Sequence, residues 1–209
     1  MGNSSATDLL SLHAIRIRGF ADTAAAARRF SLDREVTEEL LLDHEARGWV
    51  QRSSFADLSG WSLTAAGREE NGRQLAAELD AIDGRADVAV AHDEFVPLNA
   101  RFLGAITKWQ LRPVPGDPMA ANDHTDFRWD DRVFDSLGYL DRRLRPLADG
   151  LAAVLDRFGG YADRFSAALG RAVQGERSWV DRTGIDSCHT VWFELHEDLL
   201  ATLGLERGA

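Results

Sequence analysis

The chain has few of the residues that crosslink small proteins or anchor them in membranes. One cysteine, Cys188, occurs in 209 residues, which excludes an internal disulfide framework and a zinc module built on several cysteines. No apolar run approaches the roughly 20 residues that a membrane-spanning helix needs. The first residues, Met1 to Ser5, lack the basic-then-apolar pattern of a signal peptide. We therefore expect a reduced, cytoplasmic protein without membrane contact.

Basic residues are also scarce relative to acidic ones. The 24 Lys and Arg residues against 34 Asp and Glu residues give a net charge of −10, and Lys108 is the sole lysine. This balance excludes a polybasic membrane anchor and argues against a protein that coats nucleic acid without sequence preference. The hydrophobic content of 44%, with six Trp and ten Phe, is sufficient for a real core.

The first 80 residues predict short helices followed by a pair of strands. Apolar residues recur at helical spacing, Asp22 or Thr23 and then Asp33 stand where N-caps belong, and Gly48 stands where a helix should end. Thr64 is placed to cap a further helix. The expected elements are helices over 8–20, 23–29 and 34–47, strands over 49–52 and 60–63 around a loop over 53–59, and a helix over 65–80.

Two segments of this region resemble the wing of MarR-type bacterial transcriptional regulators. The first is EARGWV, from Glu45 to Val50, and the second is WSLTAAGR, from Trp61 to Arg68. In that family a small-Gly-aliphatic helix end leads into the wing, and an L-T-x-x-G-R segment closes it. The resemblance covers residues 9–75, about a third of the chain. It implies a winged helix-turn-helix whose third helix enters the major groove of DNA.

Candidate DNA contacts follow from that resemblance. The second helix should end in a backbone clamp, the third should read bases, and the wing should touch phosphates. The candidates are Arg28, Arg29, Arg34, Thr37, Arg52, Ser53 and Ser54.

The charge of the third helix opposes this assignment. With Val36 and Leu40 expected to face the core, four of the outward residues are carboxylates that phosphates repel. Residues 1–80 hold nine Arg against thirteen acidic residues, a net charge of −4. The alternative is that the arginines pair with these carboxylates on a solvated surface. The carboxylates are Glu35, Glu38, Glu39 and Glu45.

The remaining two thirds predict an all-helical bundle. A stripe from Val88 to Trp109, at spacings of three and four, indicates a long amphipathic helix over 87–111 with a kink near Pro97. The proline-rich stretch over 112–126 cannot be helical. Further helices are expected over 129–145, 147–158, 161–174 and 184–203.

Polar residues on the apolar stripes of this bundle suggest a small-molecule pocket. Aromatic walls with a few oriented polar groups are typical of such sites. The alternative is that the Trp and Phe rings fill the core while the histidines bond to each other or to the backbone. The candidate ligand-binding residues are His92, Asn99, Trp109, His124, Trp129, His189, Trp192 and His196.

The sequence shows no metal, cofactor or catalytic motif. His189 and His196 are seven residues apart, or about 10.5 Å along a helix, too far for two Zn–N bonds of about 2.1 Å. Cys188 and His189 are neighbours whose side chains diverge by about 100° on a helix, so they do not form a nucleophile–base pair. We expect no enzyme activity and no bound metal or cofactor.

Together these patterns predict a mainly α protein with a winged helix-turn-helix and two-stranded wing over 6–80. A helical effector-sensing or dimerisation domain should follow over 85–205. The expected function is transcriptional regulation by a homodimer that binds double-stranded operator DNA and senses a small molecule. The alternative is a protein-docking module without specific DNA binding, whose acidic helix meets a basic partner. A weaker resemblance of Leu58–Thr64 to winged-helix segments of phosphoenolpyruvate-utilising dikinase-like proteins accompanies it.

Overall fold

The computed structural model describes residues 2–55 and 58–206. In that part of the chain it contains eight α-helices and a two-stranded antiparallel sheet, so the prediction of a mainly helical protein is confirmed. No helix there is both long enough and apolar enough to cross a lipid bilayer. Unit 1 comprises Met1–Val88, Ala152–Arg157 and Glu194–Ala209, and unit 2 comprises Ala89–Leu151 and Phe158–Phe193.

Unit 1 begins with helices that pack around a small apolar core. The Asp22 carboxylate accepts the N–H of Ala25, and the Asp33 carboxylate accepts two N–H groups of the third helix, as expected for N-caps. The buried core includes Leu12, Leu41 and Trp61. The helices are α1 (Thr7–Arg18), α2 (Thr23–Arg29), α3 (Arg34–Ala46) and α4 (Ala65–Ala81).

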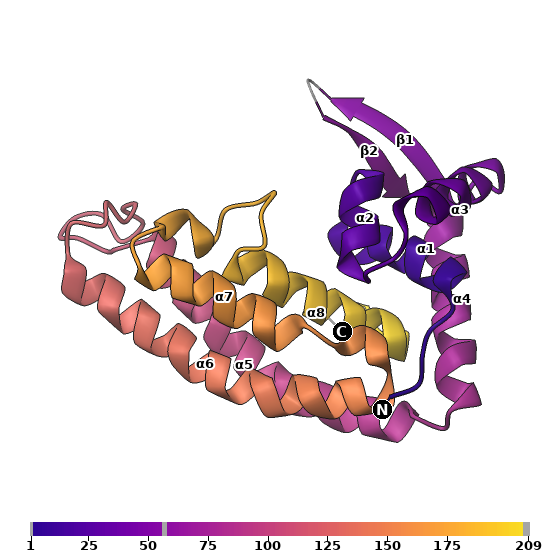
Figure 1. Cartoon of the computed structure of the whole chain (residues 1–209). Helices are drawn as coiled ribbons and strands as arrows, with labels where there is room; N and C mark the ends of the chain where they lie inside the picture. The colour runs from indigo at the N-terminus through magenta and orange to yellow at the C-terminus, as the bar shows by residue number, and fades with distance from the viewer. Residues whose placement is uncertain (1, 56–57, 207–209) are drawn as a thin grey trace. The chain divides into compact units, whose positions relative to one another are not determined.

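A β-hairpin extends away from these helices (Figure 1). It consists of β1 (Val50–Phe55) and β2 (Leu58–Leu63), with Arg52 opposite Trp61. The strands are longer than predicted, because residues 53–55 and 58–59 of the expected loop are paired; residues 56–57 of that loop lie outside the described part of the chain. Pairing there satisfies backbone groups that a loop would leave to water.

The threonine and glycine of the Leu63–Arg68 segment have a structural role. The Thr64 hydroxyl accepts the N–H of Gly67 at 3.0 Å and donates to the carbonyl of Gly48 at 2.6 Å. A Cβ on Gly67 would lie 1.8 Å from the carbonyl oxygen of Trp49, so only glycine fits. These two residues therefore fix the start of α4 against the end of α3.

Unit 2 is helical and has an aromatic interior. Phe102, Phe165 and Trp192 come from three different helices and contact one another. Three helices contribute residues to both units, since α5, α6 and α8 each cross a unit boundary. The helices are α5 (Arg85–Gln110), α6 (Phe127–Val154), α7 (Tyr161–Val173) and α8 (Cys188–Leu203), with 3-10 turns at Asp156–Phe158 and Arg177–Trp179.

Two predicted helix boundaries are wrong. The helices expected over 129–145 and 147–158 are replaced by α6, which continues through Pro146 to Val154. Pro146 is exposed, so water can solvate the carbonyl that loses its helical partner. Helix α8 starts at Cys188 rather than at Gly184, whose φ of +81° is not helical.

Candidate nucleic-acid interface and a buried ionic cluster

The exposed face of α3 is mixed in charge and partly apolar. Val36 is 44% exposed, whereas Thr37, Leu41 and His44 are fully buried. The predictions that Val36 faces the core and that Thr37 faces DNA are therefore wrong, because the buried row starts one residue later. The Thr37 hydroxyl donates to the Asp33 carbonyl at 2.6 Å, which satisfies it inside the protein. The exposed residues of α3 are Arg34, Glu35, Val36, Glu39, Leu42, Asp43 and Ala46.

A hollow of about 470 Å³ lies where the starts of α2 and α3 meet the hairpin. Four of the predicted DNA contacts line it, namely Arg34, Arg52, Ser53 and Ser54. The same hollow is also lined by Asp22 and Glu38, so two carboxylates balance the formal charge of the two arginines at this place. One arginine from the helix and one from the hairpin thus meet at a single concave surface.

Arg52 is held in this hollow by acidic and aromatic neighbours. Its guanidinium lies 3.4 Å from Glu38, 3.6 Å from Glu45 and 4.4 Å above the Trp61 ring. The alternative that the arginines pair with carboxylates of the third helix is confirmed for this residue. A phosphate that binds Arg52 must compete with both carboxylates, while the stacking keeps the side chain oriented.

The two arginines that end α2 have different environments. Arg28 is exposed, but the Arg29 side chain is only 3% exposed and its Nε lies 3.4 Å from Glu194. Glu194 also accepts a hydrogen bond from Arg18 at 2.9 Å. The prediction that Arg29 faces DNA is wrong, because a buried guanidinium beside a carboxylate does not reach a phosphate.

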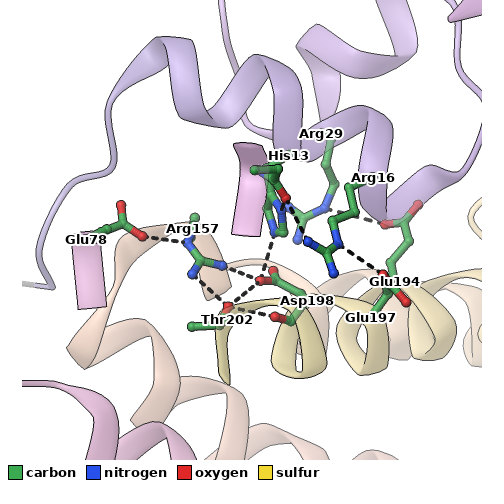
Figure 2. Close-up of polar contacts among 10 residues, drawn as sticks. His13, Arg16, Arg29, Glu78, Arg157, Glu194, Glu197, Asp198 and Thr202 are labelled. Carbon is green, nitrogen blue, oxygen red and sulfur yellow. Dashed lines mark hydrogen bonds and ion pairs between the residues drawn. The ribbon is translucent and has the colours of Figure 1, made fainter. Parts of the chain in front are cut away.

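A buried carboxylate, Asp198 of α8, lies at the centre of the ionic cluster in unit 1 (Figure 2). Its Oδ1 accepts a short hydrogen bond from Arg157 and lies 3.0 Å from Nε2 of His13. The other ring nitrogen of His13 lies 3.2 Å from Oδ1 of Asn71. Burial alone would raise the pKa of Asp198, but the charges of Arg157 and His13 outweigh it and hold that pKa well below its usual range. Asp198 is therefore an anion at neutral pH.

The cluster extends from Asp198 to other helices of unit 1. Arg157 donates to Glu78 of α4 at 3.2 Å and to the Thr202 hydroxyl at 2.8 Å. Arg16 of α1 donates to Glu197 of α8 at 3.2 Å, as Figure 2 shows. The network thus connects α1, α4 and the second half of α8, and removal of Asp198 leaves Arg157 and His13 without the carboxylate they share.

Sequence reasoning did not identify this cluster. A signal was present, since Glu194 and Asp198 lie one turn apart and share a helix face with the apolar Val191 and Leu195. That spacing can mark a buried acid. The spacing does not indicate that His13, which is 185 positions away, is the partner of Asp198.

Part of the predicted ligand-binding set packs in the interior of unit 2. The indole N–H of Trp192 donates to Asn99 at 3.0 Å, and its ring stacks on Phe102 at 4.6 Å. The His189 ring lies 4.3 Å from the Phe193 ring, and burial lowers the pKa of His189. Of these predicted residues Trp192 is buried in the core, whereas Asn99 and His189 are half-buried beside it.

A second part of the predicted set gathers where α5 ends. Trp109 packs against His124 at 4.3 Å, and Nδ1 of His124 lies 3.1 Å from the Asp130 carboxylate. The indole N–H of Trp129 donates to the Lys108 carbonyl at 2.7 Å. Trp109 is ten residues beyond Asn99 on α5, or about 15 Å along the helix, so the two groups are separate.

The two remaining predicted residues join neither group. His92 is half-buried, with Nδ1 3.8 Å from Asp93, and His196 belongs to unit 1. None of the eight residues lines the hollow beside the hairpin. Over residues 2–55 and 58–206, no three His, Cys, Asp or Glu side chains are arranged to hold a metal ion. Burial raises the pKa of the Cys188 thiol to about 12, which keeps it protonated.

Comparisons with known protein families, with curated proteins and with solved structures found no match. The likeness to MarR-type regulators therefore rests on the two motif segments alone. What the structure adds is the exposure of each arginine and the contacts of each carboxylate in unit 1.

Proposed function

We propose that this protein is a DNA-binding transcriptional regulator in which unit 1 acts as a winged helix-turn-helix. The observation that carries the proposal is the hollow shared by Arg34 of α3 and by Arg52, Ser53 and Ser54 of β1. In a winged helix the recognition helix and the wing approach the same stretch of duplex. A guanidinium from each element, together with hydroxyl donors, suits a DNA phosphate at that place.

The acidic residues of α3 restrict which DNA can bind. Glu35, Glu39 and Asp43 repel phosphates, so contacts through Arg28, Arg34 and Arg52 alone give weak non-specific affinity. Carboxylates can accept a hydrogen bond from the exocyclic amine of cytosine in the major groove. Binding should therefore depend on sequence more than it does for a basic recognition helix.

Unit 2 is the proposed ligand-sensing part of a cytoplasmic homodimer. Helix α8 supplies Trp192 to the core of unit 2 and Asp198 to the ionic cluster of unit 1. A ligand that binds unit 2 can change the conformation of unit 1 only if the protein has two conformations and the ligand binds them with different affinity. A continuous helix is a suitable element to carry that difference.

The test is fluorescence anisotropy with a native upstream duplex and a random duplex over a salt series. We expect the native duplex to bind more tightly. Arg52→Ala should weaken both complexes similarly and reduce the slope of log affinity against log salt by about 1 per copy. Arg145→Ala is the matched control, since Arg145 pairs with Asp163 in unit 2, and it should change nothing. An unchanged slope for Arg52→Ala contradicts the placement of the hairpin on DNA.

A docking module remains the second candidate, because Val36 and Leu42 are exposed beside the carboxylates of α3. The double variant Glu35→Arg/Glu39→Arg separates the two functions. Both residues are exposed, whereas Glu38 accepts a hydrogen bond from Thr23 and is best left intact. If α3 faces DNA, the variant should bind DNA more tightly. No DNA binding by either protein at low salt would favour a basic protein partner.

A further inference from the structure

Unit 2 has a surface groove of about 590 Å³ between α5 and α6. Small-molecule sites occupy roughly 300–1,000 Å³. The groove is separate from the aromatic core and shares no residue with the predicted ligand-binding set. Its lining residues are Glu94, Pro97, Leu98 and Arg101 of α5 and Tyr139 and Arg143 of α6.

The spacing along both helices explains why these side chains meet. The α5 residues Glu94, Pro97, Leu98 and Arg101 occupy positions i, i+3, i+4 and i+7, and Tyr139 and Arg143 are one turn apart, so each set lies on one helix face. Leu98 is 8% exposed and supplies an apolar surface together with Pro97. The groove therefore combines a small aliphatic patch with polar groups.

The polar groups of the groove have few partners in the protein. The Arg101 guanidinium lies 4.0 Å above the Tyr139 ring, which orients it. Among the residues that the structure describes, neither Arg101 nor Arg143 has an ion-pair partner, and the Tyr139 hydroxyl has no hydrogen bond. Arg145, two residues further along α6, pairs with Asp163 at 2.9 Å. With Glu94, which also lines the groove, the two arginines leave a formal net charge of +1 at this place.

We propose that this groove binds a small organic carboxylate with a short aliphatic body. The carboxylate would accept hydrogen bonds from Arg101, Arg143 and the Tyr139 hydroxyl, since guanidinium groups bind carboxylates through paired N–H donors. The aliphatic body would lie on Pro97 and Leu98. The groove would be the site, and a carboxylate the ligand class, for the proposed ligand-sensing role of unit 2. Ligand binding itself does not depend on that proposed function, whereas any effect of the ligand on DNA binding does.

Isothermal titration calorimetry of the full chain tests the proposal, with sodium octanoate as the probe and octanamide as its neutral counterpart. Octanoate should bind and octanamide should bind far more weakly. Arg101→Gln and Arg143→Gln should each weaken octanoate binding about tenfold or more. Arg145→Gln is the matched control and should bind octanoate like the unaltered protein. All three arginines are exposed, so thermal unfolding should confirm that each variant folds.

Three results overturn the groove assignment: no heat with octanoate, equal binding of octanamide, or unchanged binding in both Arg101→Gln and Arg143→Gln. DNA binding is measured separately by anisotropy with and without octanoate. Octanoate binding without any change in DNA affinity supports the groove and contradicts the ligand-sensing part of the proposed function. Absence of DNA binding overturns the regulator and leaves the calorimetric result in force.

Discussion

The two halves of α8 place their buried side chains in different surroundings. Up to Phe193 the helix contributes Trp192, which stacks on aromatic rings in unit 2. From Glu194 onward it contributes Asp198, which is surrounded by Arg157 and His13 in unit 1. Aromatic packing tolerates substitution by rings of similar shape, whereas a buried charge requires its specific partners. The second half of α8 should therefore be more sensitive to single changes than the first half.

The largest effect is expected for Asp198→Ala. This change leaves Arg157 and His13 buried without their anion, and breaking such a pair costs about 3–5 kcal/mol of unfolding free energy. Urea denaturation followed by circular dichroism measures it. Asp163→Ala, which removes an exposed carboxylate of unit 2, is the control and should cost under about 1 kcal/mol. A loss below about 1 kcal/mol for Asp198→Ala contradicts the role of the cluster.

A smaller effect is expected for Trp192→Phe. The substitution loses the hydrogen bond to Asn99 and some volume but keeps a ring against Phe102, so it should cost about 1–2 kcal/mol. The same denaturation experiment measures it. Asn99→Leu on both backgrounds separates the hydrogen bond from the packing. A greater loss for Trp192→Phe than for Asp198→Ala would reverse the comparison between the two halves of α8.

The smallest effect is a pH dependence to which each unit contributes one histidine. Burial lowers the pKa of His44 in unit 1 and of His189 in unit 2, so the unfolded chain binds more protons than the folded chain. The stabilisation is complete above the unfolded pKa of about 6.5 and is lost as pH falls from there toward each folded pKa. The midpoint temperature of thermal unfolding should therefore fall as the pH is lowered through about 6.5. His44→Gln and His189→Gln should each flatten the profile, and a profile that neither variant changes contradicts the burial argument.

Local elements of the fold were predictable from the sequence, because caps and apolar spacing act over a few residues. Asp22, Asp33 and Thr64 cap helices as expected. The predicted buried face of α3 was displaced by one residue. The set Val36 and Leu40 and the set Thr37, Leu41 and His44 both have helical spacing and contain apolar residues, so spacing alone did not decide between them. Helix α6 continues through Pro146 because that residue is exposed and water can solvate the carbonyl left without a helical partner. The sequence pattern alone did not show that this side of the helix would face solvent.

The candidate sites were less predictable, because they depend on partners far apart in the chain. Arg29 has the same sequence signature as Arg28, and only the approach of Glu194 buries it. Arg101 and Arg143 stand among many surface arginines, and only the packing of α5 on α6 places them at one groove. Apolar spacing predicted the helices that carry these residues, but it did not predict which residues of other helices would lie beside them.

The pairing of His13 with Asp198 has a consequence for the order of events during synthesis. The ribosome makes α1 early and must add 185 more residues before the carboxylate partner of His13 exists. Domains generally fold as units while the chain emerges, N-terminal parts first. Here the N-terminal helix acquires its ionic partner only after the residues of unit 2 have been translated. A nascent chain interrupted before α8 therefore lacks the carboxylate on which the buried charges of unit 1 converge.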